Sequence, residues 1–188
     1  MIYKRMYVAY VSDKDIKINE CSKVLTHTLG YYDNLAVLYY ESSEPDVAPP
    51  DFASGSTQGL PDGRHWIEAT EIFHYFEPKN DAQWVRKIEN KTGRIFVSHL
   101  NRDMIASYIY YHVEHQHDNQ IGVDKFLSIF LFEDIAFMYS ETPTEKVTWD
   151  DIKGRNHHGA RYKWTPLMRK HLKEWPDGTK SWKSLKKG

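Results

Sequence analysis

The sequence predicts an α+β protein with a ferredoxin-like antiparallel sheet, helices on one face of that sheet, and a C-terminal helical extension. Strand-like and helix-like segments follow one another in the order β-α-β, long loop, β-α-β, then a helix, two strands and a last helix. Two consecutive βαβ halves are typical of ferredoxin-like sheets, and no longer repeat is visible that would indicate a solenoid or propeller. An open α/β sheet is the alternative, because no local motif decides between the two.

The first part of the chain is expected to form a strand, a helix and a second strand. Residues 3–11 are rich in Tyr, Val and Met, which favours a buried strand. Residues 18–29 place apolar side chains three or four positions apart, as on one face of a helix, and Gly30 would end that helix. The continuous aliphatic and aromatic run at residues 35–41 predicts a central strand.

A long loop follows at residues 44–64. It holds four prolines and three glycines within 21 residues, and it shows neither helix nor strand periodicity. Connections of this length are uncommon in a compact domain and are usually functional or disordered. We therefore hypothesise that this loop is a mobile cover over a pocket.

The middle of the chain holds the clearest helix. Apolar and polar residues alternate over 67–76, which predicts a strand, and Asn80 is expected to cap a short helix over residues 80–88. Residues 94–99 have strand-like composition. Residues 102–117 then place apolar side chains on one side of a helix.

Two apolar strands, at residues 126–132 and 135–140, are predicted to pair through an acidic two-residue turn. They are the most hydrophobic part of the chain and should lie centrally. A last helix is predicted to open at Thr165-Pro166, since Pro suits the first helical position. The apolar side chains that share one face of it are Met168, Leu172 and Trp175. We expect Trp164, Leu172 and Trp175 to pack on the rest of the protein, because they would otherwise form a sticky surface patch.

Composition excludes several classes of protein. The 188 residues fit one domain, or one domain with an appended segment. The apolar runs are too short for a membrane-spanning helix, and the first residues lack the apolar core of a secretion leader. The single cysteine, Cys21, cannot form an internal disulfide. We therefore expect a cytoplasmic protein that does not enter the membrane.

Charge is divided sharply along the chain. Residues 1–152 carry 14 Lys and Arg against 24 Asp and Glu, whereas residues 153–188 carry 11 against 2. This predicts an acidic α+β domain, residues 1–152, and a basic extension, residues 153–188, that packs on this body or joins subunits of a homo-oligomer such as a homodimer. Nucleic acid is not the expected partner, because the body lacks the basic face that phosphate binding needs. His157 and His158 are expected in an exposed polar loop.

The candidate site is a group of histidines and tyrosines around the helix predicted at residues 102–117. His112 continues the apolar face of that helix with Tyr108, and we predict that both border a pocket with Tyr139 from a neighbouring strand. His112 and Tyr108 are the candidate catalytic residues, since imidazole and hydroxyl groups can transfer protons. Tyr139 and the nearby His115 are the candidate ligand-binding residues.

The sequence predicts neither a cofactor nor a metal. The loop glycines fit neither GxGxxG nor GxxxxGK[ST], the patterns that hold phosphates. His112 and His115 lie three residues apart, which departs from HExxH. A metal held by these two histidines would need a further ligand, for which His74, His99 and Glu71 are candidates.

Together these observations favour a small-molecule-binding protein with a pocket lined by His and Tyr. Aromatic residues make up 14% of the chain, and a tyrosine can stack on a ring while it hydrogen-bonds the ring's edge. The sequence leaves open whether the protein is also an enzyme. The alternative is a non-enzymatic interaction module whose basic extension contacts a subunit or an acidic partner.

Overall fold

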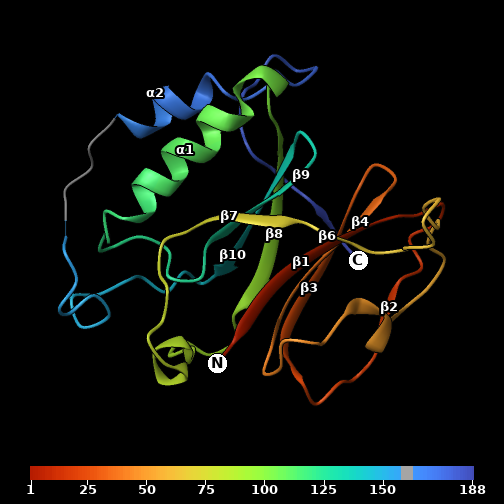
Figure 1. Cartoon of the computed structure of the whole chain (residues 1–188), viewed down its shortest axis with the longest axis horizontal. Helices are drawn as coiled ribbons and strands as arrows, with labels where there is room; N and C mark the ends of the chain where they lie inside the picture. The colour runs from red at the N-terminus through yellow and green to blue at the C-terminus, as the bar shows by residue number, and fades with distance from the viewer. Residues whose placement is uncertain (158–162) are drawn as a thin grey trace. The chain divides into compact units, whose positions relative to one another are not determined.

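The computed structural model describes residues 1–157 and 163–188 (Figure 1), so His158 of the predicted polar loop lies outside the described residues. The chain divides into two compact units, each with its own large sheet. Unit 1 consists of Met1–Thr70 and Leu185–Gly188, and unit 2 consists of Glu71–Ser184. This division by packing differs from the division by charge at residue 152.

Unit 1 is built on an antiparallel sheet of five strands in the order β12-β3-β4-β1-β6, and a second small sheet pairs β2 with β5. Its strands are β1 (Tyr3–Tyr10), β2 (Lys17–Ile18), β3 (Val24–Tyr32), β4 (Leu35–Ser42), β5 (Ala53–Ser54), β6 (Ile67–Glu68) and β12 (Lys186–Lys187). Every residue of β4 is buried. The predicted central strand at 35–41 is therefore confirmed, and β1 confirms the strand predicted at 3–11.

The helix predicted over residues 18–29 is wrong, because this segment forms β2 and the first part of β3. β3 pairs antiparallel with β4 along its length. The run from Val24 to Tyr32 is rich in β-branched and aromatic side chains, which pack well on a sheet. The apparent helical stripe does not share one core either, since Leu25 is 52% exposed whereas Leu29 is buried.

The loop predicted at residues 44–64 is partly ordered. It contains a 3-10 turn, η1 (Pro49–Asp51), and strand β5. Val47 and Phe52 are buried in the hydrophobic core of unit 1, and the Tyr40 hydroxyl donates to the backbone carbonyl of Val47 at 2.5 Å. These contacts fix the first half of the loop within unit 1 and do not support a mobile cover there.

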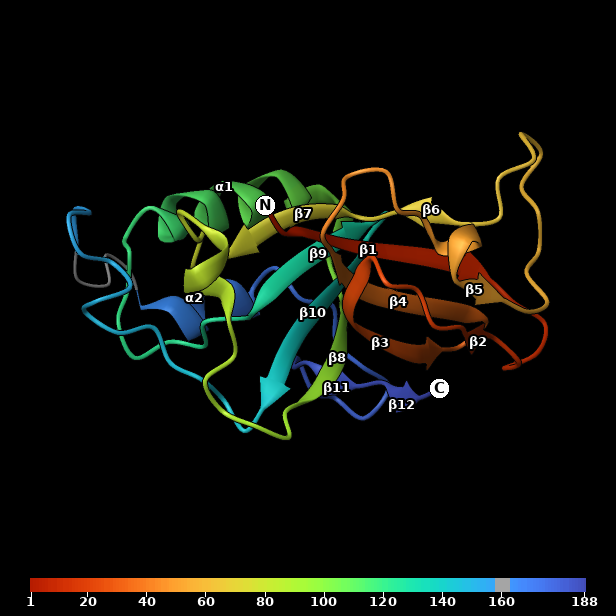
Figure 2. The same ribbon diagram turned by 90° about the horizontal axis from the view of Figure 1, so that it is seen from below.

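Unit 2 combines a five-stranded sheet, in the order β11-β8-β10-β9-β7, with two helices that lie side by side (Figure 1). Its strands are β7 (Thr70–His74, of which the first residue is counted in unit 1), β8 (Thr92–His99), β9 (Ser128–Phe132), β10 (Ile135–Thr142) and β11 (Lys183–Ser184). Its helices are α1 (Ile105–Gln116) and α2 (Trp164–Arg169), and its 3-10 turns are η2 (Asp81–Trp84) and η3 (Arg102–Met104). Figure 2 shows β8, β10 and β9 next to one another, and their pairings are antiparallel.

Several predicted elements of unit 2 are confirmed. α1, preceded by η3, is the helix predicted at 102–117. β9 and β10 form the predicted hairpin, in whose turn Glu133 has a φ of 52°. Residues 80–88, however, form only η2, where the Asn80 side chain accepts a hydrogen bond from the backbone N–H of Gln83. Asn80 therefore caps this segment as predicted, but a single 3-10 turn takes the place of the predicted helix.

The chain is therefore a mixed α+β protein with antiparallel sheets and few helices. The ferredoxin-like arrangement is not confirmed, because the first predicted βαβ half has strands in place of its helix. α2 ends at Arg169, so Leu172 and Trp175 lie beyond the helix predicted to contain them. Among the described residues, no helix is long and apolar enough to cross a membrane.

Candidate functional site

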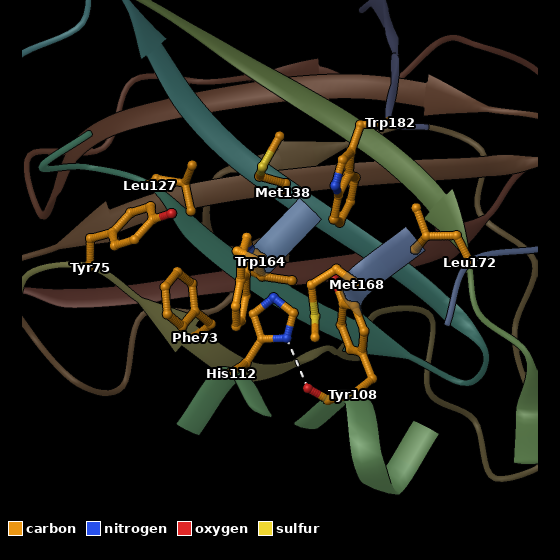
Figure 3. Close-up of a pocket in the computed structure, with 11 residues that line it drawn as sticks. Phe73, Tyr75, Tyr108, His112, Leu127, Met138, Trp164, Met168, Leu172 and Trp182 are labelled. Carbon is orange, nitrogen blue, oxygen red and sulfur yellow. Dashed lines mark hydrogen bonds between the residues drawn. The ribbon is translucent and has the colours of Figure 1, made fainter. Parts of the chain in front are cut away.

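Unit 2 contains a pocket between its two helices and the sheet (Figure 3). Its volume is about 100 Å³. The lining residues come from both helices, from three strands and from the segments next to them: Phe73, Tyr75, Tyr108, His112, Leu127, Ile129, Met138, Trp164, Met168, Leu172 and Trp182. Aromatic and aliphatic side chains therefore make up most of the wall.

The geometry of α1 brings Tyr108 and His112 to this pocket together. Residues four apart on a helix lie one above the other on the same face, and both side chains are almost fully buried. The His112 ring meets Phe73 and Trp164 edge-on, with ring centroids 5.1 and 4.8 Å away. The centroid of the Tyr108 ring lies 4.1 Å from it. The structure thus brings two predicted site residues together, while their roles stay predictions.

Hydrogen bonding fixes the protonation of His112. Its Nδ1 lies 2.8 Å from the backbone carbonyl oxygen of Tyr108, and because a carbonyl can only accept, Nδ1 carries the proton. Burial lowers the pKa of the His112 imidazole to about 4, although the bond to Tyr108 opposes this shift. At neutral pH the ring is therefore uncharged, and Nε2 is an acceptor that points away from α1 into the pocket (Figure 3).

The electrostatics of this pair favour hydrogen bonding over proton transfer. Burial raises the pKa of the Tyr108 hydroxyl, whereas it lowers the pKa of His112. The hydroxyl is then a weaker acid, and the imidazole a weaker base, than the same groups in water. General acid–base catalysis is most efficient when the pKa lies near the working pH. At neutral pH both shifts therefore work against proton exchange between these groups and a ligand.

His115 supports the pocket wall but does not line the pocket. Its position three residues after His112 turns its side chain about 60° away around the helix. Its ring stacks on Trp164, with centroids 4.0 Å apart, and on Phe73, with centroids 5.9 Å apart. Its Nδ1 lies 3.2 Å from Oδ2 of Asp118. His115 is therefore buried beside Trp164 and outside the lining of this pocket, and its role as a ligand contact stays a prediction.

Tyr139 was predicted in the pocket wall, and this prediction is wrong. It follows Met138 on β10, and consecutive side chains of a strand point to opposite faces. Met138 lines the pocket, so Tyr139 points away from it and donates its hydroxyl to Oε1 of Glu141 at 2.8 Å. Burial opposes the ionisation of Glu141, but hydrogen bonds from Arg86, Lys91 and Tyr139 outweigh it, and the pKa of this carboxyl lies below its ordinary value.

Sequence reasoning missed part of the wall. Trp164 and Leu172 are predicted only to pack on the protein, and they do pack in the core of unit 2 while also lining the pocket. The sequence gives no indication that Trp182 lines a pocket, because this residue belongs to no predicted helix or strand. Trp175 stays outside the pocket, where its ring meets that of His99 edge-on with centroids 5.3 Å apart.

Among the described residues, the candidate metal ligands near α1 do not come together. Within the part of the chain that the structure describes, no three His, Cys, Asp or Glu side chains converge as metal ligands would. Two of the candidates for a further ligand do lie close together, since Nδ1 of His74 is 3.4 Å from Oε1 of Glu71. They do not complete a ligand set with His112 or His115.

What the arrangement offers chemically is a mostly apolar pocket with an oriented hydrogen-bond acceptor, Nε2 of His112, beside the hydroxyl-bearing rings of Tyr75 and Tyr108. No family model matches the chain, and neither a curated protein nor a solved structure matches it.

Proposed function

We propose that unit 2 binds a small, uncharged, largely apolar molecule in the pocket between α1, α2 and the sheet. The observation that carries this proposal is the lining: among the described residues that form the pocket, none is charged at neutral pH. Apolar walls with a few oriented polar groups are typical of small-molecule sites. A charged ligand would lose its hydration in this pocket without gaining an oppositely charged partner.

The size of the pocket limits the ligand to about one ring. An engineered cavity of about 150 Å³, lined by Leu, Ile and Phe, binds benzene, and the pocket here offers about 100 Å³. Leu127 and Trp182 line the pocket and are only partly buried, so the wall is not sealed from solvent at these two residues. Small ligands gain at most about 1.5 kcal/mol per non-hydrogen atom and usually far less. We therefore expect a Kd of about 10 μM to 1 mM.

The alternative, an interaction module that uses the basic extension, has less support. Part of the basic charge is neutralised within unit 2, since Lys173 Nζ lies 2.5 Å from Oδ2 of Asp134 and Lys183 Nζ lies 2.5 Å from Oδ2 of Asp177. The segment also contributes Leu172 to the core of unit 2. These contacts favour an extension that packs on its own chain over one that joins subunits of a homo-oligomer.

Titration of the full chain with benzene, toluene, phenol and indole, followed by NMR, tests the proposal. We expect saturable binding of at least one compound, with shift changes at the pocket residues. Leu127→Trp should abolish binding, because the larger ring fills the pocket from its rim. Leu131→Trp is the matched control: Leu131 is also a partly buried leucine packed on the same core, but it does not line the pocket.

The two tryptophan variants give clear outcomes. Leu131→Trp should bind the same compounds with unchanged affinity. If the wild-type chain binds none of the four compounds, or if Leu127→Trp binds them as tightly as wild type does, the proposal is refuted.

A further inference from the structure

We propose that the pocket selects a phenol, meaning a neutral single ring whose hydroxyl donates a hydrogen bond to Nε2 of His112. This inference rests on the proposed function, because it names the ligand class of the same pocket. The geometry that carries it is a buried acceptor, fixed in direction, within a wall made mostly of aromatic and aliphatic side chains (Figure 3).

The first step concerns what His112 can do. Its Nδ1 is already used as a donor to the Tyr108 carbonyl oxygen at 2.8 Å. The proton of the neutral ring is thus on Nδ1, and Nε2 holds a lone pair. Burial keeps the ring in this neutral form, because it lowers the pKa to about 4. A ligand that meets Nε2 therefore has to supply a hydrogen-bond donor.

The second step concerns how firmly the acceptor is held. Phe73 and Trp164 contact the His112 ring edge-on, and Tyr108 packs beside it. Trp164 is itself fixed by the ring of His115, which stacks on it with centroids 4.0 Å apart. A group whose orientation is set by packing and by a hydrogen bond keeps its direction when a ligand arrives. Nε2 is in this sense a preorganised acceptor.

The third step concerns discrimination between ligands of equal size. Phenol and toluene are close in shape and differ by a hydroxyl in place of a methyl. A wholly apolar pocket favours toluene, because the hydroxyl loses its hydration on entry. Nε2 of His112 reverses this order: toluene covers the acceptor and leaves it without a partner, whereas phenol supplies one. Benzoate is disfavoured, because no side chain that lines the pocket is positively charged and Nε2 has no proton to donate to a carboxylate.

The experiment measures the Kd of phenol, toluene and benzoate for the full chain at pH 7 by NMR titration. We expect phenol to bind at least about tenfold more tightly than toluene, and benzoate not to saturate. His112→Leu should reverse the order, so that toluene binds more tightly. His112→Gln should keep part of the phenol preference, because the amide oxygen can accept. Leu131→Met is the control, as Leu131 packs on the same core without lining the pocket, and a change at nearly constant volume there should leave the preference intact.

A second readout needs no variant. The ¹⁵N resonance of His112 Nε2 should shift when phenol is added and stay in place when toluene is added. If toluene binds the wild-type chain as tightly as phenol does, the phenol inference is overturned while the proposed function stands. If His112→Leu keeps the preference for phenol, the role of His112 is overturned. If phenol, toluene, benzene and indole all fail to bind, the proposed function is overturned as well.

Discussion

His112 is kept neutral by its burial, and this links the stability of the protein to pH. The pKa of its imidazole is about 4 in the folded chain, against about 6.5 for an unperturbed histidine. As pH falls from about 6.5 to 4, the unfolded chain takes up this proton first, so the folded state loses stability across that window. A difference of about 2.5 pKa units corresponds to about 3 kcal/mol of unfolding free energy as an order of magnitude.

Replacement of His112 by Gln removes this titration. We expect the unfolding free energy of the wild-type chain to fall by about 3 kcal/mol more than that of His112→Gln between pH 7 and pH 4. Denaturant unfolding at pH 7, 5.5 and 4 measures both, and the carboxylates that titrate in the same window cancel in the comparison. Parallel pH dependences in the two proteins would show that the imidazole is not held neutral by the fold.

Individual residues show why only part of the candidate site could be predicted from the sequence. His112 and Tyr108 share a face on any helix through this segment, so their joint position follows from the sequence. Tyr139 and Met138 could not be separated in this way, because both faces of β10 bear buried side chains. A strand without polar alternation gives no sign of which face meets a helix. The chemistry of its ring and hydroxyl favoured Tyr139 as a site residue, but the strand points its side chain away from the pocket.

At the scale of elements, long and strongly patterned segments were predictable and ambiguous ones were not. α1 and the β9–β10 hairpin combine clear periodicity with clear boundaries. The helix prediction for the segment that forms β3 failed for a geometric reason. Residues four apart share a face on a helix, and they also share a face on a strand. Leu25 and Leu29 therefore fit both structures. Their spacing favoured a helix, and pairing with β4, which only the folded chain shows, decided for the strand.

Alanine substitutions at these two leucines test the strand. Leu25 is 52% exposed beside the irregularity at the start of β3, so Leu25→Ala should change the unfolding free energy by less than about 0.5 kcal/mol. Leu29 is buried in the core of unit 1, so Leu29→Ala should cost about 2–4 kcal/mol. Urea unfolding of the full chain measures both. Large and equal costs at the two positions would instead indicate the helical stripe.

At the scale of the whole molecule, the end of the chain belongs to both units. β11 pairs with β8 in the sheet of unit 2, and β12 pairs with β3 in the sheet of unit 1. Both strands are two residues long, so they have no periodicity that a sequence pattern could reveal. The net charge indicates a separate basic extension that begins at residue 153. In the folded chain, however, this segment supplies edge strands to both sheets, core residues to unit 2 and part of the pocket wall.

Two truncations separate these contributions. A chain that ends at Ser184 loses β12 but keeps every residue that lines the pocket, so single-ring compounds should bind it with unchanged affinity. A chain that ends at residue 152 loses the pocket-lining residues Trp164, Met168, Leu172 and Trp182. Burial of a large apolar side chain is worth about 1.5–3 kcal/mol. Since Met168 and Leu172 are buried and Trp164 is partly buried, we expect this truncation to cost about 4–8 kcal/mol and to abolish ring binding.

Denaturant unfolding and NMR titration with phenol measure both effects on the same samples. The Ser184 truncation controls for a loss of stability that does not touch the pocket, because the strand it removes belongs to unit 1. Unchanged unfolding free energy and unchanged phenol binding after truncation at residue 152 would show that the extension neither packs in the core of unit 2 nor forms the pocket wall. Loss of phenol binding in the Ser184 truncation would place residues 185–188 in the site, in contradiction to the residues that line the pocket.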